Sequence, residues 1–196
     1  MPHKTLLTAF NHSTYIDSFN DQFKFKVKKL DSVIRTVFRN FTVYMVSFEG
    51  ISINGSSITA SRIGICAPYV DITSSHLDSS GRGCFSHEGI GAGLLGGDCA
   101  GGGGAHASRA GAGAGSAQCA VHFARPHYFT KEARYEGSGG ASGVRLAETG
   151  GSGGGIVWVS TTGRVILENS TVSADGANGV VANGTNGSGG GAGGSI

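Results

Sequence analysis

Charged residues, prolines and long apolar runs are all scarce in this sequence of 196 residues, and each scarcity excludes a class of protein. Charged residues make up 14% of the chain and the net charge is +2, which excludes the concentrated basic surface of a nucleic-acid-binding protein. No run approaches the roughly 20 apolar residues that a membrane-spanning helix needs. The 3 prolines, and glycines without a three-residue period, exclude collagen.

Glycine is the residue in excess, and it is unevenly distributed. Only Gly50, Gly55 and Gly64 precede residue 81, so the other 33 of the 36 glycines follow Ser80. We therefore expect a strand-rich N-terminal segment over residues 1–50 and a glycine-rich part over 51–196. The glycine-rich part contains a region over 82–149 that carries cysteines. That region is either a flexible loop or a set of closely stacked backbones where only a hydrogen fits at Cα.

The N-terminal segment has strand-like alternation. In Phe23–Val27 aromatic and aliphatic residues alternate with lysines, which predicts a strand with one apolar face. Ser32–Phe38 and Phe41–Phe48 are rich in β-branched and aromatic residues and predict further strands, with a helix over Asp31–Arg39 as the alternative. The lysine face is expected to be solvated or to guard a sheet edge, and a docking surface for an acidic partner or polysaccharide is the alternative.

An internal repeat is the most informative feature of the chain. Pro68–Gly81 and Gly163–Gly176 match at a fixed offset of 95 residues, and they define two related units at about 51–81 and 150–196. The matched pairs are Val70 with Val165, Ile72 with Leu167, Ser75 with Ser170, Leu77 with Val172, and Gly81 with Gly176. The preceding strands match with a shift of one, so that Ile63 and Ile65 correspond to Val157 and Val159.

Repeats of short strands with one apolar face predict an all-β fold in which each unit stacks on the next. We expect a glycine-rich parallel β-helix, or solenoid, preceded by a short N-terminal β-strand segment. The glycine runs would form corners or loops between coils, and a β-sandwich with glycine-rich insertions is the competing architecture. Ser195–Ile196 is expected to begin a further set of strands, continued in a longer chain or completed by a neighbour.

Five stretches in order resemble large glycine-rich extracellular proteins of plants and protists. These stretches are Gly101–Gly111, Tyr135–Gly140, Gly150–Val159, Val172–Gly179 and Gly187–Ile196. The resemblance implies β-helix-like cell-surface or matrix proteins, with parts similar to protist surface-filament glycoproteins. It covers about residues 50–196, and it departs from the family pattern where Ala-Ser follows His106. It carries over no catalytic residue.

Two further signals predict secretion. The four cysteines, an even number, are Cys66, Cys84, Cys99 and Cys119. Six Asn-x-Ser/Thr sequons predict N-glycosylation, at Asn11, Asn40, Asn54, Asn169, Asn183 and Asn186. We expect a secreted, extracellular or cell-surface protein whose signal peptide is not in this sequence. Two disulfides are expected, in any of three pairings, one of which joins Cys99 to Cys119 and Cys66 to Cys84. A zinc site at Cys84-x-x-His87 and Cys119-x-x-His122 is the alternative.

No arrangement of residues indicates catalysis, a metal or a cofactor. The carboxylates that a polysaccharide-active β-helix would need do not converge by spacing; they are Asp71, Asp78, Glu168 and Asp175. Asp98 and Asp175 are isolated, unlike the repeated acidic turns of calcium-binding β-rolls. Trp158 and Tyr135 are expected to be packing residues, with a carbohydrate-stacking platform as the alternative.

The sequence therefore predicts a structural extracellular glycoprotein that self-assembles into a surface filament or matrix, as a homo-oligomer or polymer held by β-strand pairing. The alternative is a carbohydrate-binding or carbohydrate-processing β-helix protein.

Overall fold

The structure is a computed structural model, and it describes residues 5–9, 12–16, 42–94, 100–106, 135–143, 150–180 and 187–196. All regular secondary structure in these residues is β-strand, so they contain no helix that could cross a membrane. The chain divides into two compact units. We call Met1–Asp78 with Val157–Ser173 the strand unit, and Ser79–Ile156 with Ala174–Ile196 the glycine unit.

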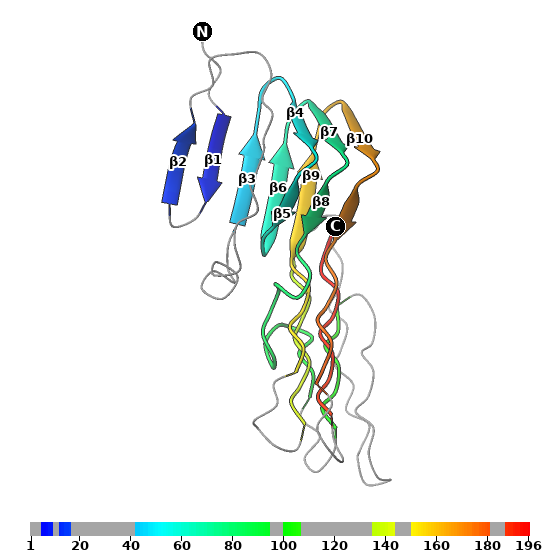
Figure 1. Ribbon diagram of the computed structural model, residues 1–196. Coiled ribbons are helices and arrows are strands. Elements are labelled where there is room, and N and C mark those ends of the chain that lie inside the picture. The colour runs from blue at the N-terminus through cyan, green and yellow to red at the C-terminus, as the bar shows by residue number, and fades with distance from the viewer. Residues whose placement is uncertain are drawn as a thin grey trace. The chain divides into compact units, whose positions relative to one another are not determined.

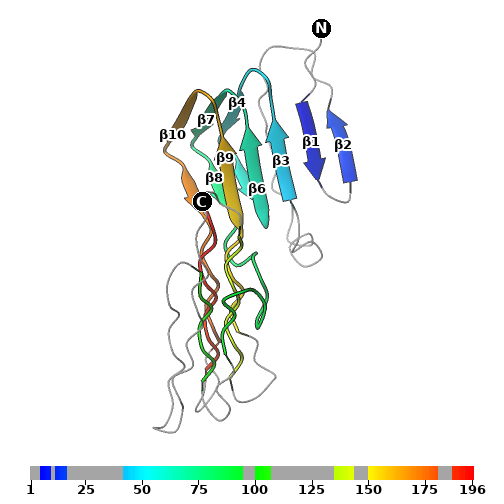
Figure 2. The same cartoon turned by 180° about the vertical axis from the view of Figure 1, so that it is seen from behind.

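Three sheets organise the described strands (Figure 1). The strands are β1 (Thr5–Ala9), β2 (His12–Ile16), β3 (Thr42–Val46), β4 (Ile51–Asn54), β5 (Ser57–Thr59), β6 (Arg62–Cys66), β7 (Tyr69–Thr73), β8 (His76–Asp78), β9 (Ile156–Ser160), β10 (Arg164–Glu168) and β11 (Thr171–Ser173). The strand orders are β2-β1-β3-β6-β9 in the first sheet, β10-β7-β4 in the second and β11-β8-β5 in the third. Figure 2 shows the first two of these sheets from behind.

Each sheet takes one strand from each of three passes of the chain. The passes are β3-β4-β5, β6-β7-β8 and β9-β10-β11. The pairs β3–β6, β4–β7, β5–β8, β7–β10 and β8–β11 are all parallel. Val70 pairs with Val165, and Leu77 pairs with Val172. The pairing register thus equals the predicted offset of 95 residues, which confirms that the repeated segments lie side by side.

The N-terminal strands differ from the rest in direction. β1 pairs antiparallel with both β2 and β3, so the first sheet is mixed. β3 confirms the strand that was predicted within Phe41–Phe48. The strands predicted at Phe23–Val27 and Ser32–Phe38 lie outside the described residues.

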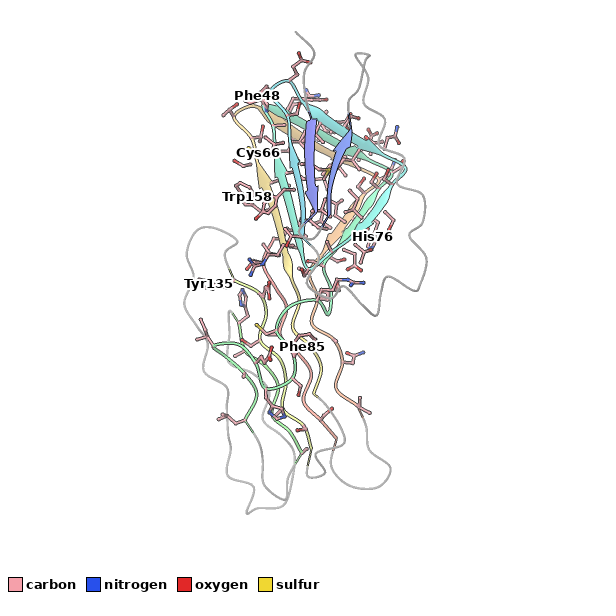
Figure 3. The ribbon with its side chains drawn as sticks, turned by 90° about the vertical axis from the view of Figure 1, so that its left-hand side faces the viewer. Phe48, Cys66, His76, Phe85, Tyr135 and Trp158 are labelled. Atoms are coloured by element: carbon pink, nitrogen blue, oxygen red, sulfur yellow. The ribbon has the colours of Figure 1, made fainter. Side chains whose placement is uncertain are left out.

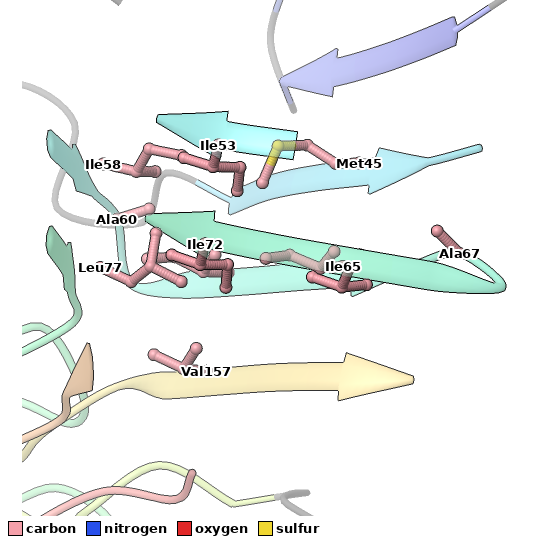
Figure 4. Packing of buried hydrophobic residues seen from close by; sticks show 11 residues of the cluster. Met45, Ile53, Ile58, Ala60, Ile65, Ala67, Ile72, Leu77 and Val157 are labelled. Carbon is pink, nitrogen blue, oxygen red and sulfur yellow. The ribbon is translucent and has the colours of Figure 1, made fainter. Parts of the chain in front are cut away.

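The core of the strand unit consists of aliphatic rows stacked from pass to pass (Figure 4). Ile53 lies beside Ile72, and Ile58 beside Leu77, as their pairing register requires. Ile53, Ile72 and Leu77 are completely buried. Burying one such side chain stabilises the fold by about 1.5–3 kcal/mol. The alternation of apolar and polar residues along these strands therefore builds the core.

A repeated corner separates the second and third strands of each pass. Gly55, Ser74 and Asn169 occupy equivalent positions, and all three have positive φ, at 57°, 50° and 48°. Glycine adopts this conformation without strain, asparagine tolerates it, and serine is less suited to it. The left-handed residue turns the chain between the two strands.

The residue after each left-handed position is serine, and these serines form a hydrogen-bonded ladder. The Ser56 N–H donates to Ser75 Oγ at 3.1 Å, and the Ser75 N–H donates to Ser170 Oγ at 3.0 Å. Ser75 Oγ also lies 2.8 Å from the Thr73 carbonyl oxygen, to which it donates. The serine shared by the two sequence repeats therefore hydrogen-bonds to backbone groups of the corner that would otherwise be buried without a partner.

The glycine unit is built from extended segments that are not β-strands. Its cross-segment hydrogen bonds advance three residues at a time: Gly101 and Gly104 donate to Gly187 and Gly190, and Gly151 and Gly154 donate to Gly189 and Ala192. These bonds are 2.8–3.0 Å long. A step of three is the repeat of a polyproline II conformation, whereas β-strands repeat every two residues. Figure 1 shows these segments running alongside one another.

Glycine is required where these backbones approach. A Cβ on Gly153 would collide with the carbonyl oxygen of Gly137, and a Cβ on Gly139 would collide with that of Phe85. The expectation that glycine runs form corners or loops is therefore wrong for these described stretches. The alternative of closely stacked backbones is confirmed there.

We predict that Gly153→Ala destabilises the protein by about 1–3 kcal/mol, because the added methyl group meets rigid backbone. Gly193→Ala is the matched control, because Gly193 is exposed and a Cβ there would have its nearest contact at 3.7 Å. Thermal unfolding followed by circular dichroism measures both, and equal melting temperatures would contradict the close-packing account.

We also predict that Ser75→Ala destabilises the protein by about 1–3 kcal/mol, because it removes the hydroxyl that accepts from Ser56 and donates to backbone. Ser57→Ala, at an exposed position on β5, should change stability by less than about 0.5 kcal/mol. Urea unfolding compares the two variants. A Ser75→Ala variant as stable as Ser57→Ala would show that the ladder contributes nothing.

Candidate assembly surface

The apolar row of the second sheet is buried or half-buried in the first two passes and exposed in the third. Ile53, Val70 and Ile72 have 0% exposure. Val165 and Leu167, which pair with Val70 and Ile72, are 38% and 51% exposed. Side chains that pair in register lie on the same face of a sheet, so all five belong to one row. The third pass therefore leaves an apolar row accessible to solvent.

The strand that carries this row is also a sheet edge. β10 pairs with β7, and no other described strand pairs with it. Its sequence places Arg164, Ile166 and Glu168 on the outer face, opposite the apolar row. The Arg164 guanidinium carbon lies 5.9 Å from the centroid of the Tyr69 ring, a cation–π contact on the neighbouring strand.

The edge of β9 is different. Ser195 forms an isolated parallel bridge with Ile156, at the first residue of β9. The expected strand at Ser195–Ile196 is thus represented by one bridge within the described residues, and its continuation stays a prediction. In the third pass, β10 is thus a strand with both an exposed apolar row and an edge that no described strand pairs with.

The sequons fall partly within the described residues. Asn54 ends β4 and is exposed, and Asn169 is exposed at the corner after β10. In the first of these sequons Ser56 is buried, and its hydroxyl donates to the Asn54 carbonyl oxygen at 3.0 Å. At two predicted glycosylation sites the asparagine itself is therefore exposed. The other four lie outside the described residues, at Asn11, Asn40, Asn183 and Asn186.

The cysteines are divided between the units. Cys66, at the end of β6, and Cys84, in the glycine unit, are both half-buried free thiols. Cys99 and Cys119 lie outside the described residues. The disulfide assignment as a whole stays a prediction.

Three of the described histidines, His76, His87 and His106, contact serine or threonine. His87 Nε2 accepts from the Ser142 N–H at 3.0 Å, and His106 Nε2 lies 3.1 Å from Ser195 Oγ. His76 Nδ1 contacts Thr171 Oγ1 between neighbouring strands. In the described part of the chain, no three His, Cys, Asp or Glu side chains gather as a metal site. Cys119 and His122 of the zinc alternative lie outside it.

Two of the candidate carboxylates accept hydrogen bonds from hydroxyl groups nearby. Asp71 accepts from the Thr73 hydroxyl at 2.8 Å, and Asp78 accepts from the Ser173 hydroxyl at 3.0 Å. Glu168 and Asp175 are exposed on β10 and after β11. The Asp71 bond thus lies within β7, and the Asp78 bond joins β8 to β11. Asp98 lies outside the described residues.

Two aromatic rings lie over a glycine on the outer face of the first sheet. Gly64 pairs with Tyr44, and a Cβ on Gly64 would collide with the Tyr44 ring and lie 3.5 Å from the Trp158 ring. Tyr44 and Trp158 are each 39% exposed. Trp158 projects outward from β9 (Figure 3). The absence of a side chain at Gly64 leaves the space that the Tyr44 ring occupies, and the Trp158 ring lies at contact distance from that space.

The predicted aromatic platform consisted of Trp158 and Tyr135, and it did not include Tyr44; Tyr135 belongs to the glycine unit. The sequence does contain a signal for Tyr44, because treating Phe41–Phe48 as one more copy of the β6 strand places Tyr44 opposite Gly64. The uncovered row on β10 had no sequence signal, since Val165 and Leu167 match their buried partners in type.

Comparisons with family models, with curated proteins and with solved structures found no match for this chain.

Proposed function

We propose that this chain is a secreted structural glycoprotein that self-assembles through its β-strands into a surface filament or matrix at the cell exterior. In this proposal it has no catalytic residue, and its partners are copies of itself. The row of Val165 and Leu167 on an edge strand carries the proposal, since an apolar row at an open edge is the feature through which sheets join.

The proposal includes a finer fold. We take the three passes to be coils of a parallel β-helix, with the core running along its axis and the N-terminal strands β1 and β2 at one end. Equal registers in three sheets, the aliphatic rows and the repeated serine corner support this assignment. A β-sandwich would bring two sheets together through hairpins rather than through parallel passes.

The extracellular part of the proposal is supported by the sequons and the even number of cysteines. Asn54 and Asn169 are exposed, as a glycan acceptor must be. Intact-mass measurement of the secreted chain, before and after enzymatic removal of N-glycans and with thiol labelling, tests glycosylation and disulfides together. Unmodified sequons and four free thiols would contradict secretion as proposed.

We predict that Leu167→Asn reduces self-association of the purified full chain by more than about tenfold, because burying a leucine contributes about 1.5–3 kcal/mol for each copy. Phe48→Asn is the matched control: Phe48 is 86% exposed but lies after β3, outside the β10 edge. Sedimentation velocity and negative-stain microscopy measure the assemblies.

Two results would overturn the assembly proposal. One is a wild-type chain that stays monomeric and forms no fibrils or networks across the concentrations tested. The other is an assembly that Phe48→Asn disrupts as strongly as Leu167→Asn, since the contact would then not involve the open row.

A second candidate function, carbohydrate binding, is favoured by the exposed pair of Tyr44 and Trp158. Flat aromatic faces over a glycine present apolar area that the C–H face of a sugar ring fits. Such a platform would tether the assembly to a polysaccharide rather than process it.

We predict that a polysaccharide bound at this platform changes the fluorescence of Trp158, which is the only tryptophan of the chain. Tyr44→Ala should abolish the saturable change, whereas Tyr69→Ala, at a tyrosine of similar exposure on β7, should preserve it. Titration with soluble polysaccharides measures both. A titration that Tyr44→Ala leaves intact would rule out this platform.

A further inference from the structure

We propose that β10 pairs antiparallel with β10 of a second copy, in a register centred on Ile166, and so forms a symmetric dimer. This inference rests on the proposed function and specifies one contact of the assembly. It states which strand of the second copy pairs with the open edge of β10, whereas the proposed function states only that copies assemble through their strands.

The order of residues along β10 favours its own copy as the partner. In an antiparallel pair centred on Ile166, Arg164 lies opposite Glu168 of the second copy, and Glu168 lies opposite Arg164 of the second copy. Val165 then lies opposite Leu167 of the second copy on the core face. Both charge pairs are attractive, and both apolar pairs add to one row.

The register is determined by the side-chain period. A slip of one residue would set core-face residues opposite outer-face residues, which would bury charge and expose the apolar row. A slip of two residues would keep the faces matched, but it would leave both charges without an opposite partner and shorten the paired segment. Centring on Ile166 pairs all five residues of β10.

The charges of β10 cannot satisfy each other within one copy. Arg164 and Glu168 lie on the same face of the strand, about 13 Å apart at the usual rise per residue. Arg164 contacts the Tyr69 ring, and no ion pair of the Glu168 carboxylate is found among the described residues. A second copy brings an opposite charge to each.

The opposite edge of the same sheet does not offer a comparable row. On β4, the other edge strand of this sheet, Ile53 is completely buried and Ile51 is half-buried. A head-to-tail contact would join the exposed row of β10 to an edge whose inward residues are less exposed than Val165 and Leu167. A two-fold contact instead joins two uncovered rows, and it closes on itself as a dimer.

Charge exchange tests this pairing on the full chain. Arg164→Glu sets two acidic side chains opposite each other in both halves of the dimer, and Glu168→Arg sets two basic side chains opposite each other. Each single variant should weaken dimerisation by about tenfold or more. The double variant R164E/E168R restores both attractive pairs and should dimerise like the wild type.

Mixing the two single variants is the sharpest measurement. Arg164→Glu and Glu168→Arg chains should form heterodimers in preference to either homodimer, because each homodimer sets like charges opposite each other and the heterodimer does not. Native mass spectrometry separates the three species by mass. Arg62→Glu, on the internal strand β6, makes the same charge change as Arg164→Glu and should leave the dimer intact.

In the register centred on Ile166, the heterodimer contains no pair of like charges. The Arg164→Glu chain carries two acidic residues on the outer face of β10, and the Glu168→Arg chain carries two basic residues there. Every acidic side chain of one strand then faces a basic side chain of the other, so both cross-strand pairs are attractive.

Circular dichroism of each variant verifies folding, and rescue by the double variant excludes a folding defect. A glycan on Asn169 would project beyond Glu168, outside the paired residues, so dimerisation is measured with and without N-glycans. Equal dimerisation of the single variants and the wild type, or a mixture without excess heterodimer, would overturn the register. If these chains still form fibrils or networks, the proposed function stands and only the β10 pairing fails; if the wild type is monomeric, both fail.

Discussion

Both units of this protein depend on hydrogen bonds between backbone segments that are far apart in the sequence. In the strand unit these bonds join passes of the chain in parallel register, and in the glycine unit they join extended segments every third residue. A backbone group buried without a partner is costly, so each segment needs neighbours at a fixed separation. Side chains then determine which kind of neighbour is allowed: aliphatic rows separate the sheets around a core, and glycine allows backbones to meet without one.

Aliphatic packing in the strand unit and backbone packing in the glycine unit expose different kinds of surface at their last segment. A row of stacked aliphatic side chains is buried only where a further pass of the chain covers it. The exposed Val165 and Leu167 show where the described passes leave the row open, and the unpaired edge of β10 lies at the same place. In the glycine unit a corresponding opening would present mostly backbone, because few side chains fit between its segments. In the strand unit, by contrast, the exposed apolar side chains of β10 continue a row that is built up from pass to pass.

Small residues have structural roles here that their chemistry alone does not indicate. Ser75 supplies an acceptor inside a corner, Gly64 leaves space for the Tyr44 ring, and Gly153 allows a carbonyl oxygen to approach. Three residues of types that elsewhere indicate catalysis or metal binding are engaged in bonds between or along strands; they are His76, Asp71 and Asp78. His76 and Asp78 join neighbouring passes, and Asp71 bonds along its own strand, as a structural role in our proposal requires.

Local pattern in the chain was enough to predict the strands of the repeat, their inward positions and their register. Alternation identifies Ile53, Ile72 and Leu77 as core residues, and the offset of 95 residues equals the observed pairing of β7 with β10, because both follow from local period and from matching side chains. Which rows are covered could be read only from the folded chain. Val165 and Val70 are the same residue type, and only the presence or absence of a neighbouring pass distinguishes them. Whether the glycine runs form loops or packed segments was also decided by tertiary structure. A glycine run is compatible with both, and packing requires partner segments from distant parts of the chain.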